Sequence, residues 1–596
     1  MRDTCLRLHI RQRRGWLFWC VIALLAGMTT VHAQQTTPAL YALPVGETPV
    51  SSSSLALSED GRVLLIANAF NDSLSIAGPL QSEVLAEIAV GADPRSVAFS
   101  ADETQAFVTN RGDGTISVVD LATQIVTTSY PVGVLPYGLV VDEAGSIFVS
   151  VQGENEVIQL DPLSGAILTR IPTPPLPTGL ALWGDFLYVT HLWSGEVSLI
   201  YLPQMQVVRT VRTGVDTALL QSITIDEANG LAYLPQSRSN AANPALTFDS
   251  TVFPVVNIIN LRDLSLIRER RITLATADRP VNMPFAAVLD RRGGLLVVNA
   301  GSGDVSSIDL ETGLARGHVQ VGANPRSIAI GRDGVTAYVH NVIDGTITLL
   351  DMRNLTVIDV LPVSTTNIPV DELLGAQLFH SASDPRLSAD GWLSCASCHF
   401  DGLSDGRVWA GINGGRNTPV LYDLDSTAPY TWEGEWDELA DVELKIRALQ
   451  AGTGLVEGEI NPAAGDAHSG LSLDLDTLTT YLLTLQGPSV PPSPDTDLIE
   501  RGQAVFEAND CAACHTAPVF TDNLRHDVGT GGEFDTPTLR WLWQSAPYFH
   551  DGRAAALEDV FLLPGAHQLT GSISPDDLNA LVAYLLSLPH AEEVQN

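Results

Sequence analysis

The chain has 596 residues, enough for several domains that each bury a hydrophobic core. Its composition is 45% hydrophobic and 17% charged, and 69 acidic residues outnumber 32 basic ones, which gives a formal net charge of −37. This composition excludes a disordered acidic protein, and the absence of a long basic block argues against a nucleic-acid-binding protein. A protein surface with this excess of negative charge repels phosphate backbones and anionic membranes and favours basic partners.

The first 33 residues have the order of a secretory signal peptide. Five arginines precede the apolar run Trp16–Ala26, and Val31-His32-Ala33 then offers a small-residue cleavage site. The apolar run is short for a bilayer span, although an uncleaved membrane anchor is the alternative. No other stretch approaches transmembrane length, so we expect a periplasmic protein with no membrane span after cleavage.

A short turn motif, Val-Gly-x-x-Pro or a weaker copy of it, recurs along residues 45–362. Its prolines are Pro49, Pro94, Pro136, Pro177, Pro284 and Pro325. Consecutive copies are 41 to 45 residues apart, except for one gap of 107 residues. That gap fits two units and an insertion, which we place in a surface segment at Gln236–Pro254 because this stretch is rich in Ser, Asn and Pro. The count is seven units.

Each unit contains four short apolar segments separated by polar turns. In the second unit they are Ser96–Phe99, Ala106–Asn110, Thr115–Asp120 and Gln124–Thr128. Four strands per unit of roughly 42 residues are typical of a β-propeller blade. Seven units therefore predict a seven-bladed propeller, whose closure removes long exposed sheet edges. Phe107–Asn110 and Tyr338–Asn341 resemble the Tyr-Val-Thr-Asn motif of the YVTN family of seven-bladed propellers, over residues ~40–362.

The pattern changes to helical periodicity after Leu361 and forms two related modules. Each module has a helical lead-in, a Cys-x-x-Cys-His motif and a closing amphipathic helix. The lead-ins are Leu374–Phe379 and Arg501–Phe506, and the closing helices contain Tyr481–Leu485 and Tyr584–Leu588. The proline-rich stretch Gly487–Pro494 between them reads as a semi-rigid linker.

The two motifs, Cys395-Ala-Ser-Cys398-His399 and Cys511-Ala-Ala-Cys514-His515, are typical of covalent haem c attachment. The two thiols can bond one porphyrin, and the adjoining histidine then becomes the proximal iron ligand. A redox Cys-x-x-Cys or half of a zinc site is the alternative, but zinc needs two more ligands near each motif. Repetition within similar modules, together with expected export, favours two covalently bound haem c groups. The other two cysteines, Cys5 and Cys20, lie in the leader.

We therefore expect a multidomain chain, an all-β seven-bladed propeller followed by two all-α cytochrome c-like modules. The expected boundaries are 1–33 for the signal peptide, 34–365 for the propeller, 366–487 for the first haem module and 488–596 for the second.

The second axial ligands differ between the two haems. All five methionines precede the modules, so neither haem finds a methionine in its own module. His567, in a loop before the last helix, is the predicted second ligand of the second haem, with a solvated loop histidine as the alternative. No His or Met occurs between His399 and His468, so the first haem is open on its distal side or held by Tyr422, Tyr430 or water. An open position suits a peroxide or another small oxidant.

Residues of about 370–590 resemble the bacterial di-haem cytochrome c peroxidase and MauG superfamily. The motifs that carry the resemblance are Asp384–Ser388, Arg416–Pro419, Trp432-Glu433-Gly434, Thr536–Arg540 and Ala546–Gly552. The resemblance implies an oxidoreductase in which a donor reduces the C-terminal haem. Electrons then pass to the first haem, held by His399, where hydrogen peroxide or a similar small oxidant is cleaved.

The resemblance also assigns roles to individual residues. Trp432 matches the tryptophan between the two haems, with an ordinary core tryptophan as the alternative. Asn417, Ser545 and Pro547 match positions that bind a calcium ion between the modules, with a dry turn as the alternative. Ser545 replaces the threonine usual in the family. Calcium prefers such hard oxygen ligands.

Three departures weaken the match to a peroxidase. The chain lacks the distal histidine that usually follows the first motif, and Pro564 stands where MauG-type enzymes place a tyrosine. The family's distal Gln/Glu pair has no clear match. Glu443, Gln450 and Glu457 lie in the right region, but we expect surface positions to explain them equally well.

The expected partner is an electron-donor protein, a basic small cytochrome or cupredoxin. One alternative is a non-enzymatic electron-transfer cytochrome that uses the propeller as a docking platform. Another is oxidation of a protein partner, as MauG-type enzymes perform. That analogy rests on the fold and not on a site in this chain.

Overall fold

The computed structural model describes residues 43–588, apart from 45–47, 246, 248, 249, 412, 413, 492–494 and 570. The expected signal peptide, with Cys5 and Cys20, lies outside the described residues, and so does part of the proline-rich linker. Within the described part of the chain, no helix combines the length and the apolar character needed to cross a bilayer.

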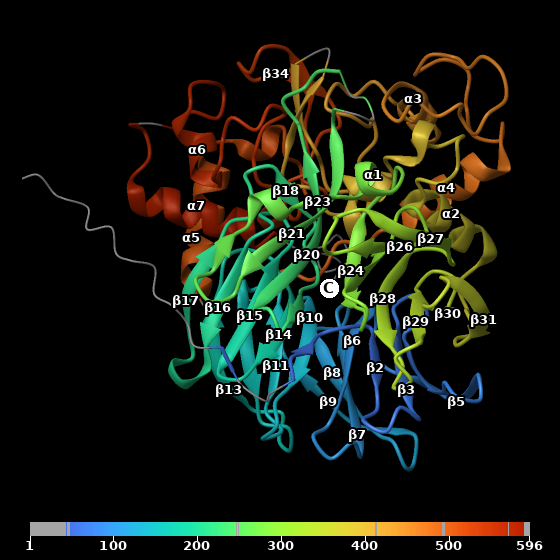
Figure 1. Ribbon diagram of the computed structural model, residues 1–596. Helices are drawn as coiled ribbons and strands as arrows, with labels where there is room; N and C mark the ends of the chain where they lie inside the picture. Colours follow the sequence, from blue (N-terminus) through green and yellow to red (C-terminus); the bar gives the residue numbers. More distant parts are fainter. Residues whose placement is uncertain are drawn as a thin grey trace, which may run out of the picture. The chain divides into compact units, whose positions relative to one another are not determined.

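Seven antiparallel sheets follow one another along the described chain and form the blades of a propeller (Figure 1). Blade 1 is β2 (Leu55–Leu57), β3 (Leu64–Asn68), β4 (Ser73–Gly78) and β5 (Glu83–Ala89). Blade 2 is β6 (Pro94–Phe99), β7 (Gln105–Asn110), β8 (Thr115–Asp120) and β9 (Ile125–Pro131). Blade 3 is β10 (Pro136–Val141), β11 (Ile147–Val151), β12 (Glu156–Leu160) and β13 (Ile167–Pro172). Blade 4 is β14 (Pro177–Trp183), β15 (Phe186–His191), β16 (Val197–Tyr201) and β17 (Gln206–Val211), with β1 (Val50–Ser51) paired to β14.

The remaining blades complete the ring. Blade 5 is the largest, with β18 (Thr217–Ala218), β19 (Thr224–Asp226), β20 (Leu231–Ser239), β21 (Val252–Asn260), β22 (Ser265–Leu266) and β23 (Ile272–Thr273). Blade 6 is β24 (Pro284–Leu289), β25 (Gly294–Asn299), β26 (Asp304–Asp309) and β27 (Ala315–Gln320). Blade 7 is β28 (Pro325–Ile330), β29 (Thr336–Asn341), β30 (Thr346–Asp351) and β31 (Thr356–Pro362). The predicted seven-bladed propeller is confirmed.

Five of the six repeated prolines mark the blades because each begins a first strand, whereas Pro49 lies just before β1, which pairs with β14 of blade 4. Pro94, Pro136, Pro177, Pro284 and Pro325 open β6, β10, β14, β24 and β28. Proline has no N–H to donate, so the start of a strand is one of the few places in a sheet that tolerates it. The middle strands are buried on both faces, as in β3, because neighbouring blades cover them, whereas the outer β5 is largely exposed.

The ring closes through side chains at the junction of blades 1 and 7. The Ser54 hydroxyl lies 2.8 Å from the Ser327 hydroxyl and 2.8 Å from Nδ1 of His340. These groups are buried, so each hydrogen bond compensates for lost contact with water. Within the residues that the structure describes, the sheets of the first and last blades are therefore joined without exchanging a strand.

The insertion at Gln236–Pro254 differs from the expected surface segment. Its two ends extend β20 and β21, which pair along nine residues each, and Gln236 is fully buried. The Ala241 carbonyl accepts a hydrogen bond from the backbone N–H of Ala410, 2.7 Å away in the first haem module. The Ser-, Asn- and Pro-rich composition correctly indicates a loop at the tip of this hairpin, but it does not indicate that the two ends of the segment pair as strands.

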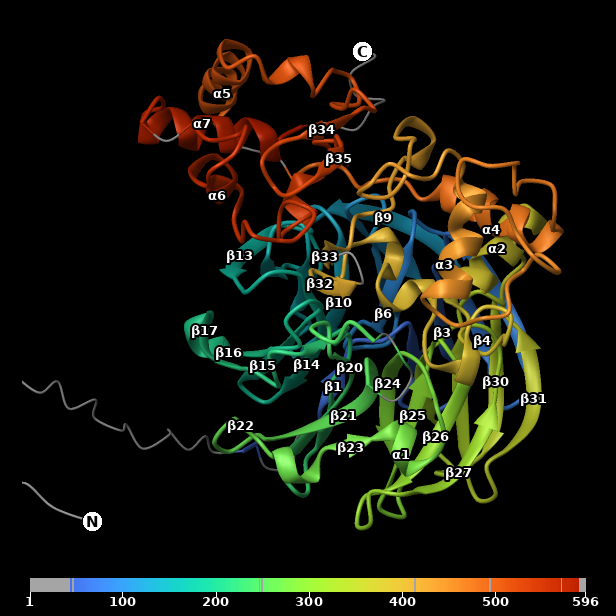
Figure 2. The same ribbon diagram turned by 90° about the horizontal axis from the view of Figure 1, so that it is seen from above.

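The chain after Pro362 forms two helical modules (Figure 2). The first contains α2 (Val370–His380), α3 (Val442–Ala448), α4 (Leu473–Thr484) and the hairpin β32 (Val408–Gly411) and β33 (Gly414–Asn417). The second contains α5 (Thr496–Ala508), α6 (Leu557–Leu562), α7 (Pro575–Leu586) and the hairpin β34 (Arg525–Asp527) and β35 (Glu533–Asp535). The predicted helical cytochrome c-like modules are confirmed, and each also carries this short two-stranded sheet. The propeller has one further short helix, α1 (Leu274–Ala277).

The lead-in and closing helices of each module pack closely at a glycine. A Cβ on Gly375 of α2 would lie 2.0 Å from the Thr477 carbonyl oxygen of α4, and one on Gly502 of α5 would lie 2.0 Å from the Ala580 carbonyl oxygen of α7. Side-chain caps begin the closing helices, since Ser472 accepts from the Leu475 N–H and Ser574 from the Asp577 N–H. Both modules therefore use the same helix pair to support their cysteine motif.

Candidate haem sites

The first cysteine motif forms a tight 3-10 turn, η4 (Cys395–Ser397). The His399 N–H donates to the Cys395 carbonyl at 2.9 Å, and Ser394 and Ser397 cap the turn. A turn of this kind can present both sulfurs and the imidazole to one bound group, and Ala396 and Phe400 beside them are buried. Cys395, Cys398 and His399 are only half-buried. This is the arrangement that two thioether links and one proximal ligand require.

The chemistry of these side chains fits a haem better than zinc. A structural zinc site takes four ligands, so two more would be needed beside a cysteine pair. Among the described residues, no group of three metal-ligating side chains includes Cys395, Cys398 or His399. Burial also lowers the pKa of His399 to about 4, which keeps its imidazole in the neutral, ligating form.

The second motif forms the same turn in more open surroundings. In η8 (Cys511–Ala513) the His515 N–H donates to the Cys511 carbonyl at 3.0 Å. Nδ1 of His515 lies 3.1 Å from the Phe520 carbonyl oxygen. Because Nδ1–H can donate to this oxygen, Nε2 is left with a free lone pair for a metal. Ala512 and Ala513 are exposed, in contrast to Ala396 of the first motif.

His567 lies opposite His515. The two ring centres are 6.3 Å apart and the rings are tilted by 42°. Two imidazoles on opposite sides of a metal, each about 2 Å away through nitrogen, place their ring centres about 6 Å apart. Nδ1 of His567 is buried and has no hydrogen-bond partner, and burial lowers the pKa of this histidine. The structure therefore brings together the two residues predicted to hold the second haem.

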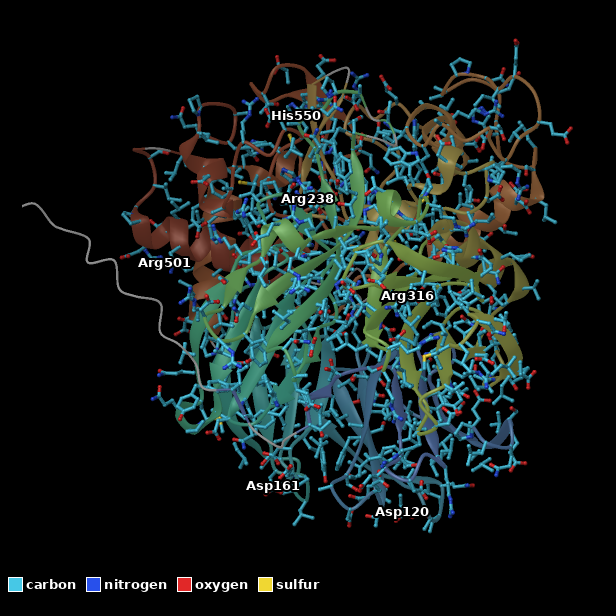
Figure 3. The ribbon with its side chains drawn as sticks, in the orientation of Figure 1. Asp120, Asp161, Arg238, Arg316, Arg501 and His550 are labelled. Atoms are coloured by element: carbon cyan, nitrogen blue, oxygen red, sulfur yellow. The ribbon has the colours of Figure 1, made fainter. Side chains whose placement is uncertain are left out.

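Trp432 is fixed between elements of the two modules. Its indole Nε1–H donates to the Asn417 carbonyl at 2.7 Å, and its ring centre lies 6.4 Å from that of His550. His550, labelled in Figure 3, stacks on Phe534 of the β34–β35 hairpin with ring centres 3.8 Å apart. Trp432 belongs to the first module and His550 to the second, so this aromatic contact joins them.

The residues predicted to bind calcium are only partly arranged for it. Asn417 is buried, its Oδ1 has no partner, and its side-chain amide contacts the Pro547 carbonyl. The unpartnered Asn417 Oδ1 is a hard ligand of the kind that calcium prefers, but the Pro547 carbonyl already accepts from the Asn417 amide N–H. The Ser545 hydroxyl instead donates to the Trp541 carbonyl at 2.9 Å. Of the three predicted positions, Asn417 thus keeps an unused oxygen, and the oxygens of Pro547 and Ser545 are both engaged.

The side chains expected near the distal side of the first haem differ in their availability. Tyr422 is buried, its hydroxyl has no partner, and burial raises its pKa. The Tyr430 hydroxyl donates to the Leu424 carbonyl at 2.9 Å. Of the two tyrosines, only Tyr422 therefore keeps an unused buried hydroxyl.

The expected surface positions of Glu443 and Gln450 are wrong, because both side chains are buried, whereas Glu457 is exposed. The Glu443 carboxylate accepts from Arg447 and from the backbone N–H groups of Leu455 and Val456. These hydrogen bonds tie Glu443 to the loop after α3. Gln450 approaches the Cys395 sulfur at 3.8 Å.

Sequence reasoning missed what the propeller contributes to the first site. The Asn282 side chain donates to the Trp392 carbonyl at 2.9 Å and accepts from the Ser394 hydroxyl at 3.0 Å, directly beside the Cys395 turn. The Trp193 indole donates to the Ser404 carbonyl at 2.8 Å. No motif signals these contacts, since the partners are more than 100 residues apart in the chain.

Comparison with known proteins agrees with this geometry. Residues 370–454 match the family model described as di-haem cytochrome c peroxidase, and residues 499–589 match that of cytochrome c. The part of the chain after residue 370 thus resembles proteins of the di-haem cytochrome c peroxidase and MauG type. The prediction of that relationship is confirmed, and a cytochrome c domain implies haem c as its cofactor.

Three relatives illustrate how far the similarity extends. The peroxidase-type region is 29% identical over 248 residues to methylamine utilization protein MauG of Methylorubrum extorquens, covering 33% of this chain and 69% of that protein. It is 25% identical over 267 residues to cytochrome c551 peroxidase of Nitrosomonas europaea, covering 36% and 78%. It is 26% identical over 268 residues to hydrazine synthase subunit gamma of Kuenenia stuttgartiensis, covering 35% and 75%.

Proposed function

We propose that the protein is an exported di-haem c-type oxidoreductase that reduces hydrogen peroxide with electrons from a donor protein. The single observation that carries the proposal is the difference between the two histidine turns. His515 faces His567, whereas among the described residues no second imidazole lies against His399. One site thus suits electron storage, and the other keeps a position for a small oxidant.

Haem c would supply one-electron chemistry at both turns and the site of peroxide cleavage at the first turn. The residues of the chain would hold and orient it. Cys395 and Cys398 would anchor the first group and His399 would bind its iron. Cys511 and Cys514 would anchor the second, between His515 and His567.

The protein controls the path between the sites. Trp432, held by the Asn417 carbonyl at 2.7 Å, fixes an aromatic ring at the contact between the modules. Overall, two electrons from the donor and two protons convert one peroxide into two waters. Asn417 and Pro547 would hold calcium beside this contact, which would stiffen it.

Exposure and charge support electron entry at the second site. Ala512 and Ala513 are exposed beside Cys511 and Cys514, and Glu507 and Asp510 are exposed just before them. Acidic groups at this edge would steer a basic cytochrome or cupredoxin to it. The first motif, covered by Asn282, offers no comparable edge.

The test uses the full-length holoprotein from a host that attaches haem c. A pyridine haemochrome assay should give two covalent haems per chain, and electron paramagnetic resonance should give one high-spin and one low-spin signal. Turnover of reduced cytochrome with peroxide should then be measured for the oxidised and half-reduced forms. Absence of turnover in both forms would favour an electron carrier, and oxidation of a protein partner would favour MauG-type activity.

Two tryptophan variants make the test sharper. Trp432→Phe should slow peroxide turnover several-fold with both haems retained. Trp436→Phe is the matched control because the backbone of Trp436 pairs with Tyr430 in the same loop, and it should leave turnover unchanged. Equal rates for the two variants would remove Trp432 from the electron path.

A further inference from the structure

Asp401 follows the first histidine by two residues and is held in an unusual conformation. It lies in the short turn η5 (Phe400–Gly402), which the Gly402 N–H closes by donating to the His399 carbonyl at 3.0 Å. Its φ angle is +53°, a region that residues other than glycine seldom adopt. Such a conformation persists where surrounding contacts fix it. The position of Asp401 is thus coupled directly to that of His399.

The contacts that fix Asp401 come from two different blades of the propeller. Arg95 of blade 2 places Nη1 2.9 Å from Oδ2 of Asp401, and Arg326 of blade 7 places Nη2 3.6 Å from Oδ1. Less than a tenth of each of the three side chains is exposed. The two guanidinium groups thus face one buried carboxyl group, and their charges are opposite to that of its carboxylate form.

The two arginines are themselves held in place. Arg95 makes a two-pronged pair with Asp93, with distances of 2.7 and 2.8 Å, and Arg111 reaches Asp93 at 3.1 Å. The Arg326 guanidinium lies 5.0 Å from the ring centre of Phe400, the residue between His399 and Asp401. Cation–π contact at this distance is favourable. The propeller therefore contacts both residues that follow His399, Phe400 through Arg326 and Asp401 through Arg95 and Arg326.

Buried charges act strongly on one another because the protein interior screens them poorly. A group at His399 that gains an electron becomes less positive, so nearby positive charge favours the reduced form and nearby negative charge opposes it. Holding the turn alone would not need charge, since a buried ion pair often contributes no more to stability than apolar packing. The chemistry of this cluster thus points to an electrostatic role.

We propose that Asp401, Arg95 and Arg326 form a bridge through which the propeller holds the His399 turn and sets the reduction potential of the first haem. Asp401 is a positioning residue in this bridge, and the propeller is part of the first haem site. The inference rests on the proposed function only in requiring a haem at the first motif.

The test is a spectroelectrochemical titration of the full-length holoprotein. Asp401→Asn removes a negative charge and should raise the potential of the first haem, whereas Arg326→Gln removes a positive charge and should lower it. The second haem should keep its potential in both variants. Arg326→Lys, which keeps the charge, should restore the wild-type value.

The matched control is Arg316→Gln. Arg316 pairs with Asp309 at 2.7 Å on the propeller surface and is labelled in Figure 3. Its loss should change neither potential. A merely structural bridge would shift the potential in the same direction for both Asp401→Asn and Arg326→Gln, and that result, or no shift in either, overturns the proposal.

Two further results separate this proposal from the proposed function. If the haemochrome assay finds a single haem, at the second motif, both proposals fail. If both haems are bound and peroxide is reduced, but the reduction potential of the first haem is the same in Asp401→Asn as in the wild type, only the proposed bridge is refuted. Should Arg326→Gln not fold, Asp401→Asn decides alone, because a fall or no change in the first potential contradicts the proposal.

Discussion

At the scale of single residues, His567 decides how the second site is closed. His567→Ala should convert the second haem from low-spin to high-spin, because the ring 6.3 Å from His515 is removed. Electron paramagnetic resonance of the oxidised holoprotein measures the change, with loss of nearly all of the low-spin signal expected. His526→Ala is the control, since that ring pairs with Asp522 in the same module. An unchanged low-spin signal in His567→Ala would assign the second ligand to another residue.

His191 makes the propeller sensitive to acid. Its ring is fully buried, Nδ1–H donates to the Pro175 carbonyl at 3.2 Å, and Nε2 accepts from the Ser198 hydroxyl at 2.9 Å. This pattern needs the neutral ring, and burial lowers the pKa of His191 to about 4. The unfolded chain takes up the proton near pH 6.5. The contribution of the neutral His191 ring to the unfolding free energy is therefore fully present above that pH and is lost as the pH falls towards 4.

The expected loss is about 3 kcal/mol across this window. Urea unfolding at pH 7.5 and pH 4.5 measures it, and His191→Gln should reduce the difference between the two pH values. His526→Gln, on a more exposed ring, should leave the difference as in the wild type. The same pH dependence in His191→Gln and the wild type would contradict the assignment.

At the scale of elements, one glycine in each helix pair allows the two helices to pack closely. Gly502→Ala should force α5 away from α7, since the new Cβ would lie 2.0 Å from the Ala580 carbonyl. Overpacking of this kind costs about 1–3 kcal/mol. Calorimetry should find a lower unfolding temperature for the second module and an unchanged unfolding temperature for the propeller. Gln503→Ala, one position along on the exposed face, is the control and should not lower it.

The elements also show where sequence reasoning works. Proline at the start of a strand and short strands between turns are local features, so Pro94 and Pro136 already mark two blades. The extended β20–β21 hairpin was not predictable in this way. Its polar tip resembles a loop, and its stem is stabilised by contacts such as that of Ala241 with Ala410, which no local pattern encodes.

At the scale of the whole molecule, Asn282 ties the propeller to the first haem module. Asn282→Ala should lower the unfolding free energy by about 1–3 kcal/mol, because the Ser394 hydroxyl and the Trp392 carbonyl lose buried partners. Thermal unfolding followed by calorimetry measures this. The control is Asn229→Ala, an exposed propeller residue bonded to Asp226. If Asn282→Ala and Asn229→Ala have the same unfolding free energy, the contact of Asn282 with the first haem module contributes nothing measurable to stability.

The whole molecule is also where prediction from sequence ends. Each cysteine motif lies within a single module, and His567 lies in the same module as the second motif, so spacing and residue types carry the chemistry. Arg95, Arg326 and Asn282 belong to different blades, and each is an unremarkable polar residue in its own repeat. Only the folded ring brings them to one turn, so no spacing rule could have joined them to His399.

The packing of the propeller against the first cysteine turn has a consequence for biogenesis. Ala396 is fully buried, and Ser394 and Ser397 are bonded to Asn282, although Cys395 and Cys398 themselves stay half-buried. A catalyst that has to surround this turn would meet fewer obstacles before the propeller and the first module have packed together. The turn at Cys511, where Ala512 and Ala513 are exposed, sets no such condition, so the two sites need not mature at the same time.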